Sequence, residues 1–310
     1  MAHESVKESL RGVAVGLLTP FDDDLEVDHD ALTENARALY NQGIRTFLAT
    51  ANISEYHSLS QSECIASAET SVTALPDDAT ILAGVGGSTK TAIELIEAYN
   101  NIGVDAMMIM PPDHTFMHEQ GLLQYYEKLA AVTDSPLSPY VRGYDPSVEF
   151  LVALTELDAV VGIKYAIEDA HKLSQAVDAV SDDVIWVDGL AEPYAPEFYL
   201  AGAEGFSAGV SNFEPAVGLA LFEALEAGEY EHAAMLRDIT LSYTDFRETR
   251  GENNTFPSAN SVPAVKKGLD LAGLNGGPVR EPLVSLSESD ERRAEELYNR
   301  LTSDMTELIE

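Results

Sequence analysis

Lys164 is the residue in this sequence with the clearest capacity for chemistry. It ends the short apolar run 160–163, Val-Val-Gly-Ile, which is typical of a buried strand. Loss of solvation disfavours a charged ammonium and lowers its pKa, and a neutral amine attacks ketones to form a Schiff base. The alternative is a lysine that extends from the strand end into solvent and pairs there with a carboxylate.

Tyr140 ends an earlier apolar run, residues 136–140, and we expect the two runs to be neighbouring strands. A phenol and an amine would then share one pocket, with the amine as nucleophile and the phenol as proton carrier. Arg142 follows two residues later, and its guanidinium can grip a carboxylate in two-pronged fashion. A surface ion pair is the alternative reading of Arg142.

Strand-like runs alternate with amphipathic helical windows along the first 228 residues. The strands are expected at 12–18, 46–49, 81–83, 105–110, 136–140, 160–164, 184–187 and 205–208. Helices are expected at 29–42, 60–75, 88–101, 119–132, 147–157, 169–180, 191–201 and 215–227. Eight strand–helix pairs predict an α/β fold of the (β/α)8 TIM-barrel type, because doubly wound open sheets usually have about five or six strands.

The remaining residues, 229–310, are helical throughout in their pattern. Helices are expected at 231–246, 262–272 and 288–309, with a loop at 250–260. We predict a barrel over residues 1–228 and a C-terminal helical extension, 229–310, packed on it.

Polar side chains gather where the predicted strands end, and active sites of such barrels lie at the C-terminal ends of the strands. The turn after the second strand places Asn52, Ile53 and Ser54 there, and the eighth strand leads into Ser207 and Asn212, so these five are candidate substrate-binding residues. Ser207 and Asn212 have the alternative of satisfying only the backbone of their loop. Glu55 has the chemistry of a general base, but a glutamate at the base of a loop more often holds the turn by bonding backbone amides.

Acidic residues dominate the charge of the chain. It has 53 acidic and 18 basic residues, and its formal net charge is −35. Such a surface repels nucleic acid and anionic lipid, so neither is expected as a partner. Acidic residues on an ordinary apolar core are typical of a halophilic protein, and stability is predicted to rise with salt.

Several other features argue against a secreted, membrane-bound or cofactor-dependent protein. No run approaches the roughly 18 apolar residues of a membrane span, and the N-terminus lacks a signal peptide, so a cytoplasmic location is predicted. Cys64 stands alone, which excludes an internal disulfide. The glycine-rich turn 84–91 lacks the glycine that precedes lysine in a nucleotide-binding loop. His114 and His118 have no evident third metal ligand, so neither metal nor cofactor is expected.

Together these residues give the chain a resemblance to the superfamily of dihydrodipicolinate synthase and N-acetylneuraminate lyase, class I Schiff-base enzymes of 2-keto acids. It spans residues 11–283 and is carried by segments 12–21, 54–55, 81–87, Tyr140, 162–164 and 205–215. Within the superfamily the chain is most similar to 5-dehydro-4-deoxyglucarate dehydratases, through segments 81–94, 211–215 and 264–283.

The resemblance implies roles for the site residues. Lys164 would form the Schiff base, Tyr140 would relay protons, and backbone N–H groups at Asn52 and Ile53 would hold the substrate carboxylate. It also implies a homotetramer. The turn 51–55 reads Ala-Asn-Ile-Ser-Glu, whereas the superfamily usually has Gly-Thr-Thr-Gly-Glu. Lysine-synthesis members carry a tyrosine where this chain has Pro111–His114, which disfavours the biosynthetic synthase.

The function that the resemblance implies is a dehydratase of a 2-keto-3-deoxy sugar acid, either 5-dehydro-4-deoxyglucarate or a 2-keto-3-deoxypentonate, in sugar-acid catabolism. An aldolase that splits the same substrates to pyruvate and an aldehyde would use the same lysine and tyrosine. A non-catalytic paralogue that binds a keto acid is the alternative of another class.

Overall fold

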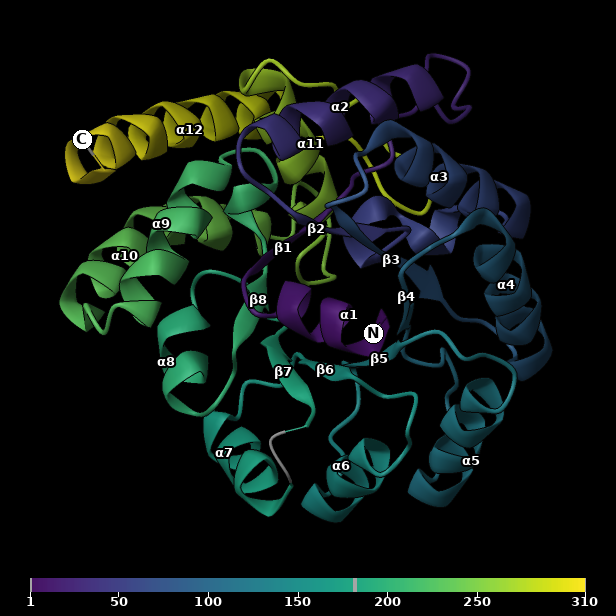
Figure 1. Ribbon diagram of the computed structural model, residues 1–310. Helices are drawn as coiled ribbons and strands as arrows, with labels where there is room; N and C mark the ends of the chain where they lie inside the picture. Colours follow the sequence, from purple (N-terminus) through teal and green to yellow (C-terminus); the bar gives the residue numbers. More distant parts are fainter. Residues whose placement is uncertain (1, 181–182, 310) are drawn as a thin grey trace.

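A closed barrel of eight parallel strands forms the centre of the protein (Figure 1). The computed structural model describes residues 2–180 and 183–309. The strands pair in sequence order, and β8 closes on β1. Their bounds are β1 Val13–Gly16, β2 Thr46–Ala49, β3 Thr80–Val85, β4 Ala106–Ile109, β5 Leu137–Val141, β6 Gly162–Tyr165, β7 Ile185–Asp188 and β8 Gly205–Ser207. The predicted TIM barrel is confirmed.

One helix follows each strand and covers the outside of the barrel (Figure 1). These helices are α2 His29–Asn41, α3 Gln61–Ala74, α4 Thr89–Ile102, α5 Glu119–Ala130, α6 Val148–Thr155, α7 Ala170–Ala179, α8 Ala195–Leu200 and α9 Pro215–Glu226. Short polar residues define several of their starts. The Ser60 hydroxyl accepts a hydrogen bond from the Glu63 amide, and the Glu63 carboxylate accepts one from the Ser60 amide. This capping box satisfies two otherwise free donors at the start of α3.

The N-terminal residues form a helix that the sequence analysis does not predict. Helix α1, Ala2–Leu10, crosses the N-terminal end of the barrel (Figure 1). Its Val6 and Leu10 pack in one cluster with inward-facing strand residues such as Leu82 and Met108. Helix α1 therefore closes the N-terminal end of the barrel, while the C-terminal ends of the strands stay open to a ligand.

The register between β5 and β6 contains one extra residue on the β6 side. Leu137 pairs with Val160, and Tyr140 pairs with Lys164. The two pairs are therefore three residues apart on β5 but four residues apart on the β6 side. An extra residue of this kind re-aims side chains and is frequent beside active sites. Here it brings Tyr140 and Lys164 to the same level of the barrel.

Three further helices pack against α9 and against one another (Figure 1). They are α10 Tyr230–Arg247, α11 Ser261–Leu271 and α12 Glu288–Ile309. Their shared core includes Tyr243, Val265 and Leu297 together with Phe213 from the loop after β8. The predicted boundary between residues 228 and 229 falls in the turn before α10, and the division into two domains stays a prediction.

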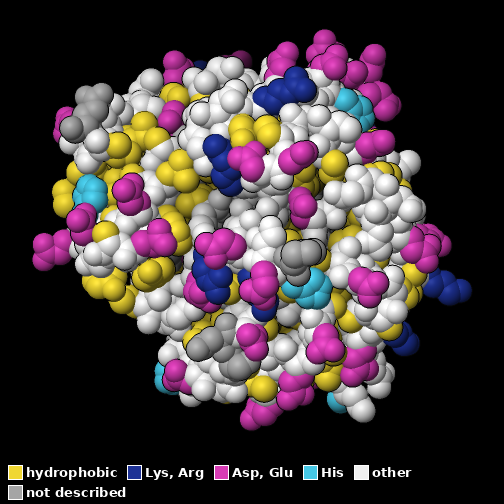
Figure 2. Space-filling model, in the orientation of Figure 1, with side chains coloured by type: hydrophobic (Ala, Val, Ile, Leu, Met, Phe, Trp, Pro, Cys, Tyr) yellow, Lys and Arg dark blue, Asp and Glu magenta, His cyan; other side chains and the backbone are white. Residues whose placement is uncertain are grey.

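Acidic side chains are spread over the face shown in Figure 2, with few basic side chains between them. This distribution agrees with the net charge of −35, and the acidic side chains at the surface repel one another. Among the helices of residues 2–180 and 183–309, none has the length and apolarity needed to cross a membrane.

Candidate active site

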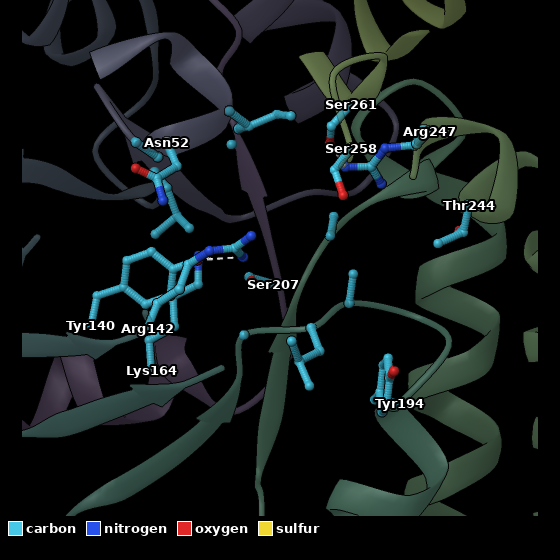
Figure 3. A pocket seen from close by; sticks show the side chains of 18 of the residues that line it. Asn52, Tyr140, Arg142, Lys164, Tyr194, Ser207, Thr244, Arg247, Ser258 and Ser261 are labelled. Atoms are coloured by element: carbon cyan, nitrogen blue, oxygen red, sulfur yellow. Dashed lines mark hydrogen bonds between the residues drawn. The ribbon is translucent and has the colours of Figure 1, made fainter. Parts of the chain in front are cut away.

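A cavity of about 440 Å³ opens at the C-terminal ends of the strands. Figure 3 shows its residues in two groups that face each other, with Tyr140, Arg142 and Lys164 on one side and Arg247, Ser258 and Ser261 on the other. The first group lies on or directly after strands β5 and β6, and the second lies on α10, on α11 and in the segment between them. A ligand in this cavity would therefore contact both parts of the chain.

Lys164 lies on β6 with its amine above the phenol ring of Tyr140. Its Nζ is 4.3 Å from the ring centroid, and the side chain is buried. Burial lowers the pKa of Lys164, and Arg142 contributes in the same direction, while Tyr140 and Asp188 oppose them. The net lowering favours the neutral amine, which is the nucleophilic form.

Arg142 follows β5 at the mouth of the cavity. Its Nη1 donates a hydrogen bond to the Tyr140 hydroxyl at 3.2 Å, drawn as a dashed line in Figure 3. No carboxylate of the described residues lies within 4.0 Å of its guanidinium, so the surface ion pair considered from sequence is not formed. Arg142 thus keeps donors available for a ligand.

The turn after β2 contributes Asn52 and Ile53 to the cavity wall. The Ile53 side chain packs against Gly16 of β1, where a Cβ would lie 2.2 Å from the isoleucine Cγ2, so glycine is required there. The Asn52 Oδ1 is buried without a hydrogen-bond partner among the described residues. Such an atom costs free energy unless a ligand or water satisfies it.

Ser54 lies in the same turn but does not line the cavity. It is fully buried, its hydroxyl accepts a hydrogen bond from the Ala51 amide at 3.0 Å, and its carbonyl accepts one from Thr19. The hydroxyl therefore holds the turn, and the substrate-binding role expected of Ser54 stays a prediction.

Glu55 also faces away from the cavity. Its Oε1 is 2.6 Å from the Lys266 Nζ of α11, and its Oε2 accepts a hydrogen bond from the Arg280 amide at 3.0 Å. The side chains of Glu55 and Lys266 are 0% and 2% exposed. This buried pair ties the C-terminal helices to the turn after β2, which agrees with the structural reading of Glu55.

Ser207 of β8 lines the cavity, and its hydroxyl donates to the Asp188 carbonyl at 3.3 Å. Asn212 does not line it. The Asn212 amide nitrogen donates to the carbonyls of Ala208 and Gly209, and its Oδ1 accepts from the Gly16 amide at 2.8 Å. Asn212 fixes the loop after β8 to β1, which agrees with the alternative in which it satisfies the loop backbone, and its contact with substrate stays a prediction.

Two buried carboxyl groups near the site were not predicted. Glu192 accepts hydrogen bonds from the amides of Gly209, Val210 and Ser211 and from the Ser211 hydroxyl, and so shapes the loop after β8. Asp188, at the end of β7, has a pKa that burial raises well above its usual range, with Glu192 adding to the effect.

The wall formed by the C-terminal helices was missed entirely. Thr244 and Arg247 of α10 line it, together with Ser258 and Ser261. A signal was present, because Arg247 follows the buried Tyr243 by four residues and therefore lies on the apolar side of its helix. A charged residue at such a position is unusual for a helix that only packs.

The two histidines considered as metal ligands form hydrogen bonds within their own turns. The Nδ1 atoms of His114 and His118 accept hydrogen bonds from the amides of Phe116 and Gln120. Within the described ranges, no three histidine, cysteine or carboxylate side chains are grouped as metal ligands would be.

The fold and this geometry define a TIM-barrel protein with a lysine–tyrosine pair at the open end. The chain belongs to the dihydrodipicolinate synthetase family, whose model matches residues 9–301. It is 27% identical to a probable 5-dehydro-4-deoxyglucarate dehydratase of Bacillus subtilis, over 92% of each chain. A protein of Streptomyces griseus with the same description is 31% identical, over 89% of this chain and 88% of the other.

A solved structure gives the same family likeness. A dihydrodipicolinate synthase from Oceanobacillus iheyensis superposes with a TM-score of 0.91 at 31% identity, covering 98% of this chain and 100% of that one.

Proposed function

We propose that the protein is a class I Schiff-base lyase that removes water from a 2-keto-3-deoxy sugar acid. The observation that carries this proposal is the buried Lys164 amine, with a lowered pKa, 4.3 Å from the centre of the Tyr140 ring in a polar cavity. Similarity to probable 5-dehydro-4-deoxyglucarate dehydratases favours the six-carbon diacid over a pentonate derivative.

The first step is attack of the neutral Lys164 amine on the C2 ketone. The carbinolamine loses water to give an iminium, and the Tyr140 hydroxyl moves the protons that this exchange requires. The substrate C1 carboxylate would meet the backbone amides of Asn52 and Ile53, neither of which has a recorded hydrogen-bond acceptor in the described structure.

The second step is loss of the C4 hydroxyl. The iminium withdraws electrons from C3, so that a proton leaves C3 and the C3–H bond electrons expel the C4 hydroxyl as water. With a six-carbon diacid, the C5–C6 bond then breaks and releases CO2, and its electrons flow through C4 and C3 into the iminium. The dienamine that results takes up a proton at C3, and its enol takes one at C4 and loses its hydroxyl proton to become the aldehyde. Hydrolysis of the iminium then returns the Lys164 amine and releases 2-oxoglutarate semialdehyde.

Two other functions fit part of this site. An aldolase would break C3–C4 of the same iminium and release pyruvate and an aldehyde. A keto-acid-binding protein without turnover would use the same cavity, and the turn sequence Ala51–Glu55 differs from the pattern usual in the superfamily.

Borohydride trapping followed by product analysis tests the proposal. A panel of 2-keto acids is incubated with the protein, borohydride is added, and intact mass reports the reduced adduct. We expect an adduct that Lys164→Ala abolishes, together with 2-oxoglutarate semialdehyde from the diacid. Pyruvate plus an aldehyde would establish the aldolase, and binding without adduct or turnover would establish the sensor.

The assembly and location remain predictions. We expect a homotetramer in the cytoplasm, and size-exclusion chromatography with light scattering tests the first of these.

A further inference from the structure

The wall that α10 and the segment after it contribute to the cavity is rich in polar groups whose bonding is incomplete. The Arg247 Nε and the Thr244 Oγ1 are both buried and have no hydrogen-bond partner in the described structure. The contact recorded for the rest of the Arg247 guanidinium is a long bond, 3.4 Å, to the Ser261 hydroxyl. Buried donors without acceptors are costly, so a polar group supplied by a ligand or by water would stabilise them.

Glu192 makes no close ion pair with Arg247. Its carboxylate lies on the same side of Gly209 as the guanidinium and attracts it. It nevertheless accepts four hydrogen bonds from the loop after β8, and no carboxylate oxygen of the described residues comes within 4.0 Å of the Arg247 nitrogens. In a chain with 53 acidic residues, an arginine without a close ion pair beside a cavity has a charge available to a ligand.

The position of Arg247 fixes which part of a ligand it would meet. Figure 3 shows it across the cavity from Tyr140 and Lys164. A substrate bound to Lys164 through C2 would direct its C1 carboxylate toward the turn at Asn52, and its chain would extend toward Arg247. The group at the far end therefore meets a guanidinium, a threonine hydroxyl and two serines.

We infer that Arg247 binds the second carboxylate of a dicarboxylic keto acid and makes the protein select diacids over monoacids of equal length. Thr244 supports it with a hydroxyl donor. The inference rests on the proposed function, because it takes the orientation of the substrate from the Lys164 adduct. It adds that the C-terminal helices, and not the barrel alone, determine substrate class.

Trapping with two matched probes tests this inference. 2-Oxoadipate and 2-oxohexanoate have six carbons each and differ in the second carboxylate. The concentration of each that gives half-maximal borohydride-trapped adduct is measured by intact mass. We expect the wild-type protein to be labelled at lower concentrations of 2-oxoadipate.

Arg247→Gln should raise that concentration for 2-oxoadipate roughly 10- to 100-fold, which is the loss typical of a hydrogen bond to a charged group. It should leave 2-oxohexanoate nearly unchanged, and Arg247→Lys should recover part of the preference. Arg237→Gln is the matched control, because Arg237 lies on the same helix and is paired at the surface with Asp238 at 2.6 Å.

The outcomes separate the inference from the proposed function. Equal labelling by the two probes in the wild type, or equal weakening of both in Arg247→Gln, overturns the inference while the Schiff base stands. If no keto acid is trapped, the proposed function fails, and calorimetric titration with adipate decides the role of Arg247 alone. Binding of adipate that Arg247→Gln removes supports the anion site, and binding that it leaves unchanged overturns it.

Thr244→Val keeps the packing volume but removes the hydroxyl. It should raise the concentration of 2-oxoadipate needed for half-maximal labelling, by a smaller factor than Arg247→Gln does.

Discussion

The Lys164 amine lies over the face of the Tyr140 ring, 4.3 Å from its centroid, and the two residues are register partners on adjacent strands. The ring covers one side of the amine, and its hydroxyl accepts a hydrogen bond from Arg142 at 3.2 Å. The amine is thus buried beside a phenol whose hydroxyl is hydrogen-bonded to Arg142. This relationship leads to predictions for each residue.

Adduct formation should accelerate with pH and level off below the pH at which free lysine titrates. Burial lowers the pKa of Lys164, so the neutral nucleophile is present at lower pH than for an exposed lysine. Trapping rates measured from pH 6 to 10 test this. An apparent pKa equal to that of free lysine would contradict a desolvated amine.

The lowered pKa of Lys164 should also make the free energy of unfolding depend on pH. Between the pKa of Lys164 in the folded protein and its higher value in the unfolded chain, only the unfolded chain binds the proton. The free energy of unfolding should therefore rise with pH across this window relative to Lys164→Met, which has no group to titrate. Urea titrations of both proteins at several pH values provide the measurement. Parallel pH profiles for the two proteins would count against the prediction.

Tyr140→Phe should separate adduct formation from turnover. The substitution keeps the ring that covers Lys164 and removes the hydroxyl that moves protons. We expect the adduct still to accumulate on long incubation, but more slowly, because the Tyr140 hydroxyl moves protons in that step. We expect kcat to fall about 10²- to 10⁴-fold, the range typical of a lost general acid–base group. Single-turnover measurements with the diacid, compared with trapping under the same conditions, test the split. An unchanged kcat would remove Tyr140 from the proposed mechanism.

The strand ends and the reactive pair were predictable because they depend on local patterns. Apolar runs of strand length locate β5 and β6, and a lysine or tyrosine at the end of such a run enters the open end of the barrel. The roles of Ser54 and Asn212 were not predictable in this way. Both lie in the correct turns, but whether a short polar side chain faces the cavity or the backbone depends on tertiary contacts.

The C-terminal wall of the cavity was missed for a different reason. Arg247 follows Lys164 by 83 residues, and nothing in the local pattern of α10 says which part of the barrel its apolar side covers. The extra residue before β6 was also invisible, because it is a property of pairing between two strands. Helix α1 is short and polar on one side, and its packing is determined by the barrel end that it covers.

The buried pair of Glu55 and Lys266 should be a strong link between the C-terminal helices and the barrel. Glu55→Gln leaves the Lys266 ammonium buried without its counter-charge, so we expect a loss of about 3–5 kcal/mol in the free energy of unfolding. The double variant Glu55→Leu/Lys266→Met removes both charges and should cost much less. Asp304→Asn, at a pair with exposures of 69% and 38%, is the surface control and should change stability by under ~1 kcal/mol. Equal losses in the single and double variants would contradict the pairing.

The acidic surface should make stability depend on salt. With a net charge of −35, the exposed carboxylates repel one another, and this repulsion is screened as the Debye length falls from about 10 Å at 0.1 M salt to about 3 Å at 1 M. We therefore expect the melting temperature to rise with KCl up to multimolar concentrations. Glu295→Gln/Glu307→Gln removes two exposed charges of α12 that have no recorded ion pair, so it should raise stability at low salt and flatten the salt dependence. A melting temperature that does not change with KCl, or a variant that changes it equally at every KCl concentration, would show that surface repulsion does not limit the stability of this protein.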